Sequence, residues 1–325
     1  MSKLRKLVIP GGGGYLGTRV ARHFATKGWK VVILSRTPRN PEINGVRMIA
    51  WNPTPPQGTF TTPAPLKEPD AWVAEIEGAE AVLNLTGRTV NCRYNDSNMR
   101  EIYDSRLRPT QLIGKAIAAA KVPPKVWLNS SSATIYRHAE ERPMDELNGE
   151  YGKGFSVDVC RKWEAALETA DTPLTRKVAL RSAMVFGTGE EGVFGAFRRI
   201  VKLGLGGTLG NGRQFVSWIH ETDFLAALEH LIEHAELAGP VNLASPHPLP
   251  NRDFMRIFRE TCGQKVGLPA NKLMLEIGAL FLGTETELLL KSRRVIPARL
   301  LEDGFVFQHP QFAEACQEII GRWED

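Results

Sequence analysis

The first residues in the chain whose type and spacing suggest a binding site are glycines. Residues 9–17 read IPGGGGYLG, in which Gly12, Gly14 and Gly17 satisfy the spacing GxGxxG. An apolar run precedes them and helical spacing follows, so the glycines lie where a strand turns into a helix. Gly12 permits a tight turn, Gly14 lets the backbone approach a pyrophosphate, and Gly17 allows close helix–strand packing. The pattern predicts a dinucleotide site, with a flexible loop as the structural alternative.

The end of the second strand indicates which dinucleotide is bound. An Asp or Glu about 20 residues beyond the glycines would bind the ribose 2′-hydroxyl of NAD. This sequence instead reads ILSRTPR, with Ser35 and Arg36 at the strand end. A carboxylate would repel a 2′-phosphate, whereas a guanidinium pairs with it. We therefore predict NADP(H) as the cofactor, although Arg36 could also be an exposed strand-end residue.

These residues need a frame of alternating strands and helices. Short runs rich in β-branched residues alternate with amphipathic segments over about 180 residues, as is typical of a doubly wound sheet. We expect strands at 6–10, 30–35, 45–51, 81–85, 125–130, 176–182, 215–219 and 240–244, and helices at 15–27, 70–77, 97–120, 156–169 and 222–235. The sequence thus predicts an α/β fold, a Rossmann-type doubly wound parallel sheet with a smaller, mainly helical C-terminal substrate domain.

The pattern also indicates two regions. Residues 1–185 are expected to form an NADP-binding Rossmann domain whose sheet is completed by parts of 214–245. Residues 186–325 are expected to form a substrate-binding region that is mainly helical after residue 246. Residues 52–69, rich in Pro and Thr, are predicted to be a long surface loop.

Composition narrows the class of protein. The chain has 325 residues, a formal net charge of +5 and 42% hydrophobic residues, which is typical of a globular protein. No apolar stretch approaches the roughly 20 residues that span a bilayer, and MSKLRKLVI lacks the apolar segment of a secretory signal. We therefore expect a cytoplasmic protein with no membrane partner.

Metal and nucleic-acid binding are not indicated either. The four cysteines form no CxxC pair, so we expect neither a metal site nor a disulfide. Basic clusters at 198–199 and 291–294 have no aromatic interleaving and no accompanying DNA-binding motif. We expect no nucleic-acid partner, and assign these clusters to solvated faces or to attraction of an anionic ligand.

Longer segments carry a family resemblance. Read as Gly11-x-x-Gly14-x-x-Gly17, the loop resembles that of the extended short-chain dehydrogenase/reductases, and LNSSSATIYR (128–137) looks like their catalytic-serine strand. KLGLGGTLGNGRQFVSWIHETD (202–223) and ELLLKSRRVIPARLLEDGFVFQHP (287–310) resemble a narrower, atypical branch of epimerase family proteins with an uncharacterised C-terminal segment. The resemblance covers nearly the whole chain.

The resemblance implies a set of cofactor contacts. Leu85–Gly87 would follow the fourth strand, Glu101 and Arg106 would face the cofactor from the long helix, and Val185 would lie at the nicotinamide end. An exposed helix pair is the structural alternative for Glu101 and Arg106. The full predicted set is Gly11, Gly12, Gly14, Tyr15, Leu16, Gly17, Ser35, Arg36, Leu85, Thr86, Gly87, Glu101, Arg106 and Val185.

The proton relay of the resembling family is missing. Its members use a serine with a YxxxK pair, in which the lysine lowers the pKa of the tyrosine. Ser132 matches the serine, but counting back from Glu164 places Ser156 and Cys160 at the tyrosine and lysine positions, and no YxxxK occurs in the chain. We name Ser132 and Tyr136 as catalytic candidates, with Tyr136 as a substitute proton donor; a structural role is the alternative.

A segment that lines the substrate cleft in relatives suggests the ligand. It contains Arg213, Gln214, Trp218 and His220, which would suit a small polar, possibly anionic molecule. The alternative places Trp218 in the core and leaves Arg213 exposed.

The expected function is that of an NADP(H)-dependent oxidoreductase of the extended short-chain dehydrogenase type, acting on an unknown small molecule. The alternative is a catalytically silent NADP-binding sensor or partner-binding protein. A nucleotide-sugar epimerase is disfavoured, because it would need tightly held NAD and a base. Relatives often pair through the helices that flank the catalytic strand, so a homodimer is a further expectation.

Overall fold

The centre of the molecule is a seven-stranded parallel sheet. The computed structural model describes residues 4–39, 43–53, 71–271, 274, 276 and 290–324. The strands lie in the order β10-β6-β5-β4-β1-β2-β3, and every neighbouring pair is parallel. They are β1 (Lys6–Pro10), β2 (Lys30–Ser35), β3 (Val46–Ala50), β4 (Ala81–Asn84), β5 (Val126–Ser132), β6 (Arg176–Ser182) and β10 (Gly239–Leu243). The predicted Rossmann-type sheet is confirmed.

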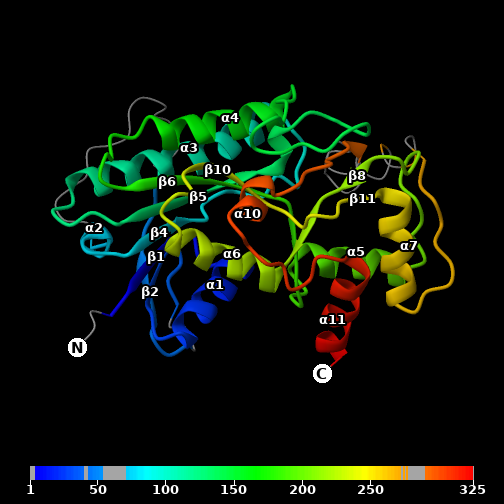
Figure 1. The fold of residues 1–325 in the computed structure, drawn as a ribbon, viewed down its shortest axis with the longest axis horizontal. Helices are drawn as coiled ribbons and strands as arrows, with labels where there is room; N and C mark the ends of the chain where they lie inside the picture. The colour runs from blue at the N-terminus through cyan, green and yellow to red at the C-terminus, as the bar shows by residue number, and fades with distance from the viewer. Residues whose placement is uncertain are drawn as a thin grey trace.

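Helices cover both faces of this sheet (Figure 1). The helices are α1 (Tyr15–Thr26), α2 (Val73–Ile76), α3 (Asp96–Ala119), α4 (Phe155–Glu168), α5 (Val193–Lys202), α6 (Glu221–Glu233), α7 (Asn251–Thr261), α10 (Ala298–Glu302) and α11 (Phe312–Glu324). Because successive strand residues alternate in direction, Leu7 and Ile9 pack with α1 and α6, whereas Val8 packs with α3 and α4. Burial on both faces explains why the strands read as continuous apolar runs.

The region beyond β6 departs from the predicted pattern of strands. The strand expected at 215–219 is divided into β8 (Phe215–Val216) and β9 (Trp218–His220). β8 pairs antiparallel with β11 (Leu249–Pro250), and β9 pairs parallel with β7 (Met184–Phe186). Ser217 lies at the division, where its hydroxyl donates to the Arg293 carbonyl at 2.7 Å and accepts from the Val295 amide at 2.9 Å. A chain segment from the C-terminal region thus separates the two strands.

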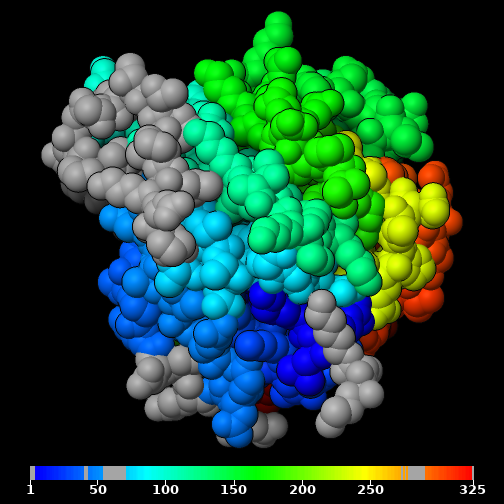
Figure 2. All heavy atoms as spheres, turned by 90° about the vertical axis from the view of Figure 1, so that its left-hand side faces the viewer, coloured from blue at the N-terminus to red at the C-terminus, as the bar shows by residue number. Residues whose placement is uncertain are grey.

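The C-terminal region packs around an aromatic core of its own. Phe186, Phe194, Phe254, Phe258 and Phe312 are all buried there, and the Phe254 and Phe312 rings stack with centroids 4.5 Å apart. The space-filling view shows orange residues of the C-terminal segment beside the yellow residues near β10 (Figure 2). Most of the predicted loop at 52–69 lies outside the described residues. No helix in the described ranges is long and apolar enough to cross a membrane.

The parallel arrangement brings the predicted site residues to one edge. The carboxyl ends of parallel strands meet at the same edge of a sheet, where doubly wound folds bind their ligands. The glycine loop follows β1, Arg36 follows β2, Leu85 follows β4, and Ser132 ends β5. The sheet therefore gathers segments that are up to 120 residues apart in the sequence.

Alanine at Gly17 is expected to destabilise the fold, because its Cβ would lie 2.4 Å from Gly12 Cα. The contact is with backbone, so α1 would have to move off the turn, and we expect the free energy of unfolding to fall by about 2 kcal/mol or more in urea denaturation. Gly321→Ala is the matched control, since Gly321 also lies in a helix and a Cβ there meets no atom within 4 Å. Equal stability of the two variants would contradict this account.

Candidate functional site

The glycine loop is packed tightly on the side that faces the sheet. Gly11 has a φ of 77°, and its amide donates to the Leu34 carbonyl at 2.9 Å. A Cβ at Gly11 would lie 2.7 Å from the Thr86 nitrogen, and one at Gly12 would lie 2.8 Å from Ile9 Cγ2. These positions therefore accept no side chain, and the loop is held against β2 and the end of β4.

The same loop is open at Gly14. A Cβ there would meet no atom within 4 Å. Gly14 is the N-cap of α1, no side chain caps this helix, and its first turn holds no acidic residue. Backbone amides at such a helix start, together with the positive end of the helix dipole, suit a phosphate group. The chain thus provides a cradle for an anion next to an uncrowded glycine.

Ser35 and Arg36 lie beside this cradle at the carboxyl end of β2. Ser35 Oγ lies 3.0 Å from the position a Cβ would take at Gly13, and it accepts from the Thr37 amide at 3.3 Å. Arg36 is exposed. This is the position in which a guanidinium can pair with a phosphate on the adenosine ribose.

The turn after β4 is shaped by a buried amide. Asn84 Oδ1 accepts from the Thr86 amide at 3.1 Å and from the Thr86 hydroxyl at 2.7 Å. Asn84 Nδ2 donates to Asn129 Oδ1 on the neighbouring strand at 2.7 Å. The Leu85 amide donates to the Pro10 carbonyl at 2.8 Å, and Gly87 continues the turn. Leu85, Thr86 and Gly87 are therefore fixed next to the glycine loop.

The two predicted cofactor residues of α3 have different surroundings. Arg106 lies against Gly87, donates to the Arg88 carbonyl at 3.0 Å, and has its guanidinium carbon 5.1 Å from the Trp163 ring centroid. Burial lowers the pKa of the Arg106 guanidinium. Glu101 is exposed and pairs with the Arg88 side chain. Arg106 thus contacts the turn after β4 at Gly87, whereas Glu101 is exposed on the surface of α3.

Tyr15 links α1, the helix that follows the glycine loop, to α6. Its hydroxyl donates to Glu221 Oε2 at 2.5 Å and accepts from the Gly189 amide at 3.2 Å. Burial, followed by the neighbouring Glu221, raises the pKa of Tyr15. Of the other predicted contacts, Leu16 and Val185 are partly buried and pack on the main core.

Glu221, the first residue of α6, also pairs with arginines of two other helices. Arg19 on α1 pairs with it at 3.0 Å, and Arg322 on α11 pairs with it at 3.2 Å. The Glu221 side chain is 6% exposed, so its charge is enclosed by these partners.

The two catalytic candidates differ in access. Ser132 is half-buried at the carboxyl end of β5, and its hydroxyl donates to Thr134 Oγ1 at 3.0 Å. Tyr136 is fully buried, where its hydroxyl donates to Asn242 Oδ1 and accepts from Arg181, both at 2.9 Å. Burial raises the pKa of Tyr136 to about 12. Tyr136 does not lie at an open cleft as expected, and this position does not favour its predicted role as proton donor.

Arg181, which the sequence reasoning did not single out, is the centre of the buried network around Tyr136. Arg181 pairs with Glu164 on α4 through two nitrogens, at 2.7 and 2.9 Å, and also donates to the Tyr151 hydroxyl at 2.9 Å. Ser131 donates to the same carboxylate at 2.6 Å. These contacts tie α4 to β5 and β6. Arg181 differs from an ordinary strand residue only in being buried, and its burial could not be predicted from the sequence.

The two positions without tyrosine and lysine lie on α4. Cys160 is buried, and burial raises the pKa of its thiol to about 12, so it stays neutral and unreactive. Ser156 Oγ lies 3.3 Å from the Tyr94 hydroxyl, and the Tyr94 ring packs on Phe155 with centroids 4.7 Å apart. A phenol from a different segment therefore reaches the start of α4. Sequence reasoning missed Tyr94 because no YxxxK spacing marks it.

The four predicted substrate residues do not converge. Trp218 and His220 are completely buried, and burial lowers the pKa of His220. Gln214 is also buried and donates to the Leu209 carbonyl at 2.8 Å. Arg213 is exposed and pairs with Glu140 at 3.0 Å. The alternative reading, with Trp218 in the core and Arg213 exposed, describes this arrangement.

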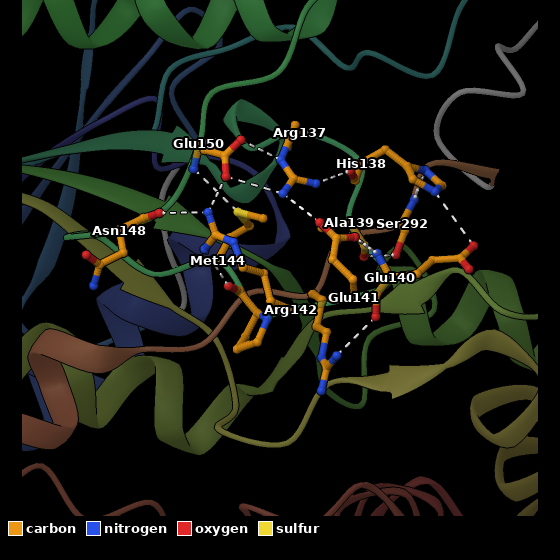
Figure 3. Close-up of polar contacts among 12 residues, drawn as sticks. Arg137, His138, Ala139, Glu140, Glu141, Arg142, Met144, Asn148, Glu150 and Ser292 are labelled. Carbon is orange, nitrogen blue, oxygen red and sulfur yellow. Dashed lines mark hydrogen bonds and ion pairs between the residues drawn. The ribbon is translucent and has the colours of Figure 1, made fainter.

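Arg213 does line a groove of about 490 Å³, together with His138, Glu140 and Glu141. Figure 3 shows Arg137 between Glu141 and Glu150, with Ser292 beside Ala139. Hydrogen bonds from Arg137 lower the pKa of Glu141 to about 2, so this carboxylate is charged at neutral pH. Three of the four lining residues follow β5 closely in the sequence, and the groove carries charges of both signs.

The C-terminal region supports the wall of this groove. The Ser292 amide donates to His138 Nδ1 at 3.0 Å, and the Ser292 hydroxyl donates to the Ala139 carbonyl at 2.5 Å. The loop after β5 is therefore held by a segment 153 to 154 residues away in the sequence.

Comparison with known proteins decides the family. A model described as the NAD dependent epimerase/dehydratase family matches residues 7–244. The chain belongs to this family. A second model, a domain of unknown function designated DUF1731, matches residues 272–319. The predicted resemblance is confirmed, including the uncharacterised C-terminal segment.

Relatives match this family member over almost its whole length. An epimerase family protein of Mycobacterium leprae is 33% identical over 325 residues, covering 99% of this chain and 97% of its own. The human epimerase family protein SDR39U1 is 29% identical, covering 97% and 99%. A crystal structure of the human protein with NADPH has a TM-score of 0.81 at 28% identity, covering 97% of this chain and 99% of its own. A UDP-N-acetylglucosamine 4-epimerase from Methanobrevibacter ruminantium, at 15% identity and a TM-score of 0.73, shares the fold.

Removal of Glu164 should destabilise the protein strongly. Glu164→Ala leaves Arg181, whose side chain is 2% exposed, without its carboxylate. An unpaired buried charge costs about 3–5 kcal/mol, which urea denaturation followed by circular dichroism would measure. The control is Glu168→Ala, an exposed position on the same helix, which should change the free energy of unfolding by less than about 0.5 kcal/mol. A small effect of Glu164→Ala would show that the pair contributes little.

Proposed function

We propose that the protein binds NADP(H) at the carboxyl edge of its sheet and uses it to reduce or oxidise a small polar molecule. The observation that carries this proposal is the glycine loop, which is closed toward the sheet at Gly11 and Gly12 and open at Gly14. The uncapped start of α1 would hold the pyrophosphate, and exposed Arg36 would hold the 2′-phosphate. The human relative crystallised with NADPH supports the same choice of cofactor.

The chain would bring its own groups to the reacting carbonyl or alcohol. When bound, the cofactor supplies or accepts a hydride. Ser132, half-buried at the end of β5, would hydrogen-bond the substrate oxygen and orient it. A proton must then reach or leave that oxygen, and buried Tyr136 is poorly placed to transfer it because Arg181 and Asn242 occupy its hydroxyl.

Tyr94 is the better proton donor. It precedes α3, and its hydroxyl lies 3.3 Å from Ser156 Oγ in the first turn of α4. Helices that connect parallel strands begin at the carboxyl edge, so the starts of α3 and α4 lie on the same side of the sheet as Ser132. Arg106 interacts electrostatically with both Tyr94 and Cys160. Arg106 thus places a positive charge near this phenol, where the family would otherwise have the lysine of position 160.

The charged groove suits a polar substrate. It begins six residues beyond Ser132 and offers the cation of Arg213 beside the carboxylates of Glu140 and Glu141. Groups of both signs favour a small molecule that carries hydroxyl, carboxylate or amine groups over an apolar one.

A second candidate function is a catalytically silent NADP-binding protein. The observation in its favour is Cys160, whose buried neutral thiol provides no charge at the position of the missing lysine. In that case the same cradle would bind the cofactor, and Ser132 would have no catalytic role.

Arg36→Asp should lower the affinity for NADPH by about 10- to 100-fold, the loss of one charge-assisted phosphate contact. NADH affinity should stay the same or rise, because a carboxylate can accept a ribose 2′-hydroxyl. Isothermal titration calorimetry measures both, with Arg22→Asp on the exposed side of α1 as a charge-matched control. Equal losses for the two dinucleotides would exclude Arg36 as the selecting residue.

Tyr94→Phe should lower turnover by about 10²- to 10⁴-fold, the usual contribution of a positioned acid, while NADPH affinity is kept. Purified protein is incubated with NADPH and a panel of polar carbonyl compounds, and oxidation of the nicotinamide is followed by absorbance. Ser132→Ala should lose activity similarly, and Tyr136→Phe should mainly lower stability. Full turnover in Tyr94→Phe would reject Tyr94 as the donor, whereas tight NADPH binding without turnover in the wild type would favour the silent binder.

A further inference from the structure

Two histidines and an aspartate meet on the side of the molecule where α6 and α10 end. His230 lies in the last turn of α6 and His234 is the C-cap of that helix, so the i, i+4 spacing places both imidazoles on one face. Their rings stack with centroids 3.7 Å apart. Asp303 is the C-cap of α10, and its Oδ2 lies 2.6 Å from His230 Nε2 and 2.6 Å from His234 Nδ1.

The three possible donor atoms lie close together. They lie within 4.8 Å of one another, and they comprise two imidazole nitrogens and one carboxylate oxygen. Zinc binds such donors at about 2.0–2.2 Å, and in a tetrahedral site these three would leave the fourth position to water. Donors at such bond lengths in a tetrahedron lie about 3.4 Å apart. Asp303 Oδ2, now 2.6 Å from each imidazole nitrogen, would therefore have to move back from both to admit the ion. The His234 side chain is 43% exposed, which gives an ion a path from solvent.

The negative charge available to an ion here is that of Asp303. At the end of α6 itself, the Arg176 guanidinium already donates to the Leu231 carbonyl at 2.6 Å. Phe305 packs edge-on against His230 with centroids 5.3 Å apart and forms an apolar wall on that side. Among the ion pairs of the described ranges, Asp303 is joined to these two imidazoles and to neither a lysine nor an arginine. Its carboxylate thus has no cationic side chain to displace.

A second trio in the molecule lacks these advantages. His220, His309 and Glu318 also offer atoms within 4.8 Å of one another. However, His220 Nδ1 accepts from the Thr222 amide at 3.1 Å, and Arg322 pairs with Glu318 at 3.1 Å. One imidazole nitrogen is therefore committed to capping α6, and a guanidinium next to the carboxylate repels a metal ion.

We propose that His230, His234 and Asp303 form a binding site for one divalent transition-metal ion, with zinc as the best match. His230 and His234 belong to the part matched by the family model, and Asp303 belongs to the C-terminal part matched by the domain of unknown function. The bound ion would cross-link the end of α6 to the end of α10. This site is separate from the nucleotide cradle and does not depend on the proposed reaction.

The test uses the full chain, treated with EDTA and then titrated with zinc chloride by isothermal titration calorimetry. We expect one saturable equivalent, and a melting temperature that rises with zinc. His230→Gln, His234→Gln and Asp303→Asn should each lower the affinity at least tenfold and remove the rise in melting temperature. Magnesium chloride should give no saturable heat, because Mg²⁺ prefers oxygen ligands. His247→Gln, an exposed histidine outside both trios, is the matched control and should bind zinc like the wild type.

The absence of saturable zinc binding would overturn the proposal. So would wild-type affinity in the three variants, or a loss of affinity in His309→Gln in their place, which would assign the ion to the second trio. Circular dichroism without metal verifies that each variant is folded. X-ray anomalous scattering from zinc-soaked crystals of the wild-type protein locates the ion independently of the variants.

Discussion

The contact on which the site depends is that of helix α1 with the turn after β1. At Gly17 a single added carbon would come within 2.4 Å of Gly12 Cα, and at Gly11 it would strike the backbone of Thr86. The absence of side chains at these points lets the helix begin close to the sheet, so that its free amides lie at the carboxyl edge. The ends of β2 and β4 are bonded to the same turn. The anion cradle at this edge is therefore a consequence of backbone packing, which the glycines allow.

Much of this architecture could be predicted because its signals are local. β-Branched runs mark the strands, helical spacing marks α1, α3, α4 and α6, and the glycine spacing marks the turn. The side chains at the site are another matter. Trp218 and His220 follow a Gly-rich segment that resembles a substrate loop, yet both are buried, because β9 pairs with β7 beneath the aromatic core. The division between β8 and β9 at Ser217 depends on a segment 76 residues away, which no local pattern reports.

The candidate proton donors illustrate the same limit. Ser156 and Cys160 stand in place of a tyrosine and a lysine, and the sequence favours Tyr136 as the substitute because it lies four residues after Ser132. In the folded chain that phenol is committed to Arg181 and Asn242, while Tyr94 approaches Ser156 from the start of another helix. A side chain that approaches from another segment of the chain has no fixed spacing in the sequence by which it could be found. Burial of Arg181 with Glu164 is likewise a property of the packed sheet and helix, and it gives the edge a rigid base.

Glu221 joins the amino-terminal and carboxyl-terminal ends of the molecule. Its carboxylate accepts a hydrogen bond from Tyr15 and pairs with Arg19, both on α1. It also pairs with Arg322 on the last helix, α11. Tyr15 follows the N-cap of the helix that holds the anion cradle, so the carboxylate to which α11 is anchored also fixes the first turn of that helix. Without Arg322, this buried carboxylate would keep one guanidinium partner, Arg19, in place of two.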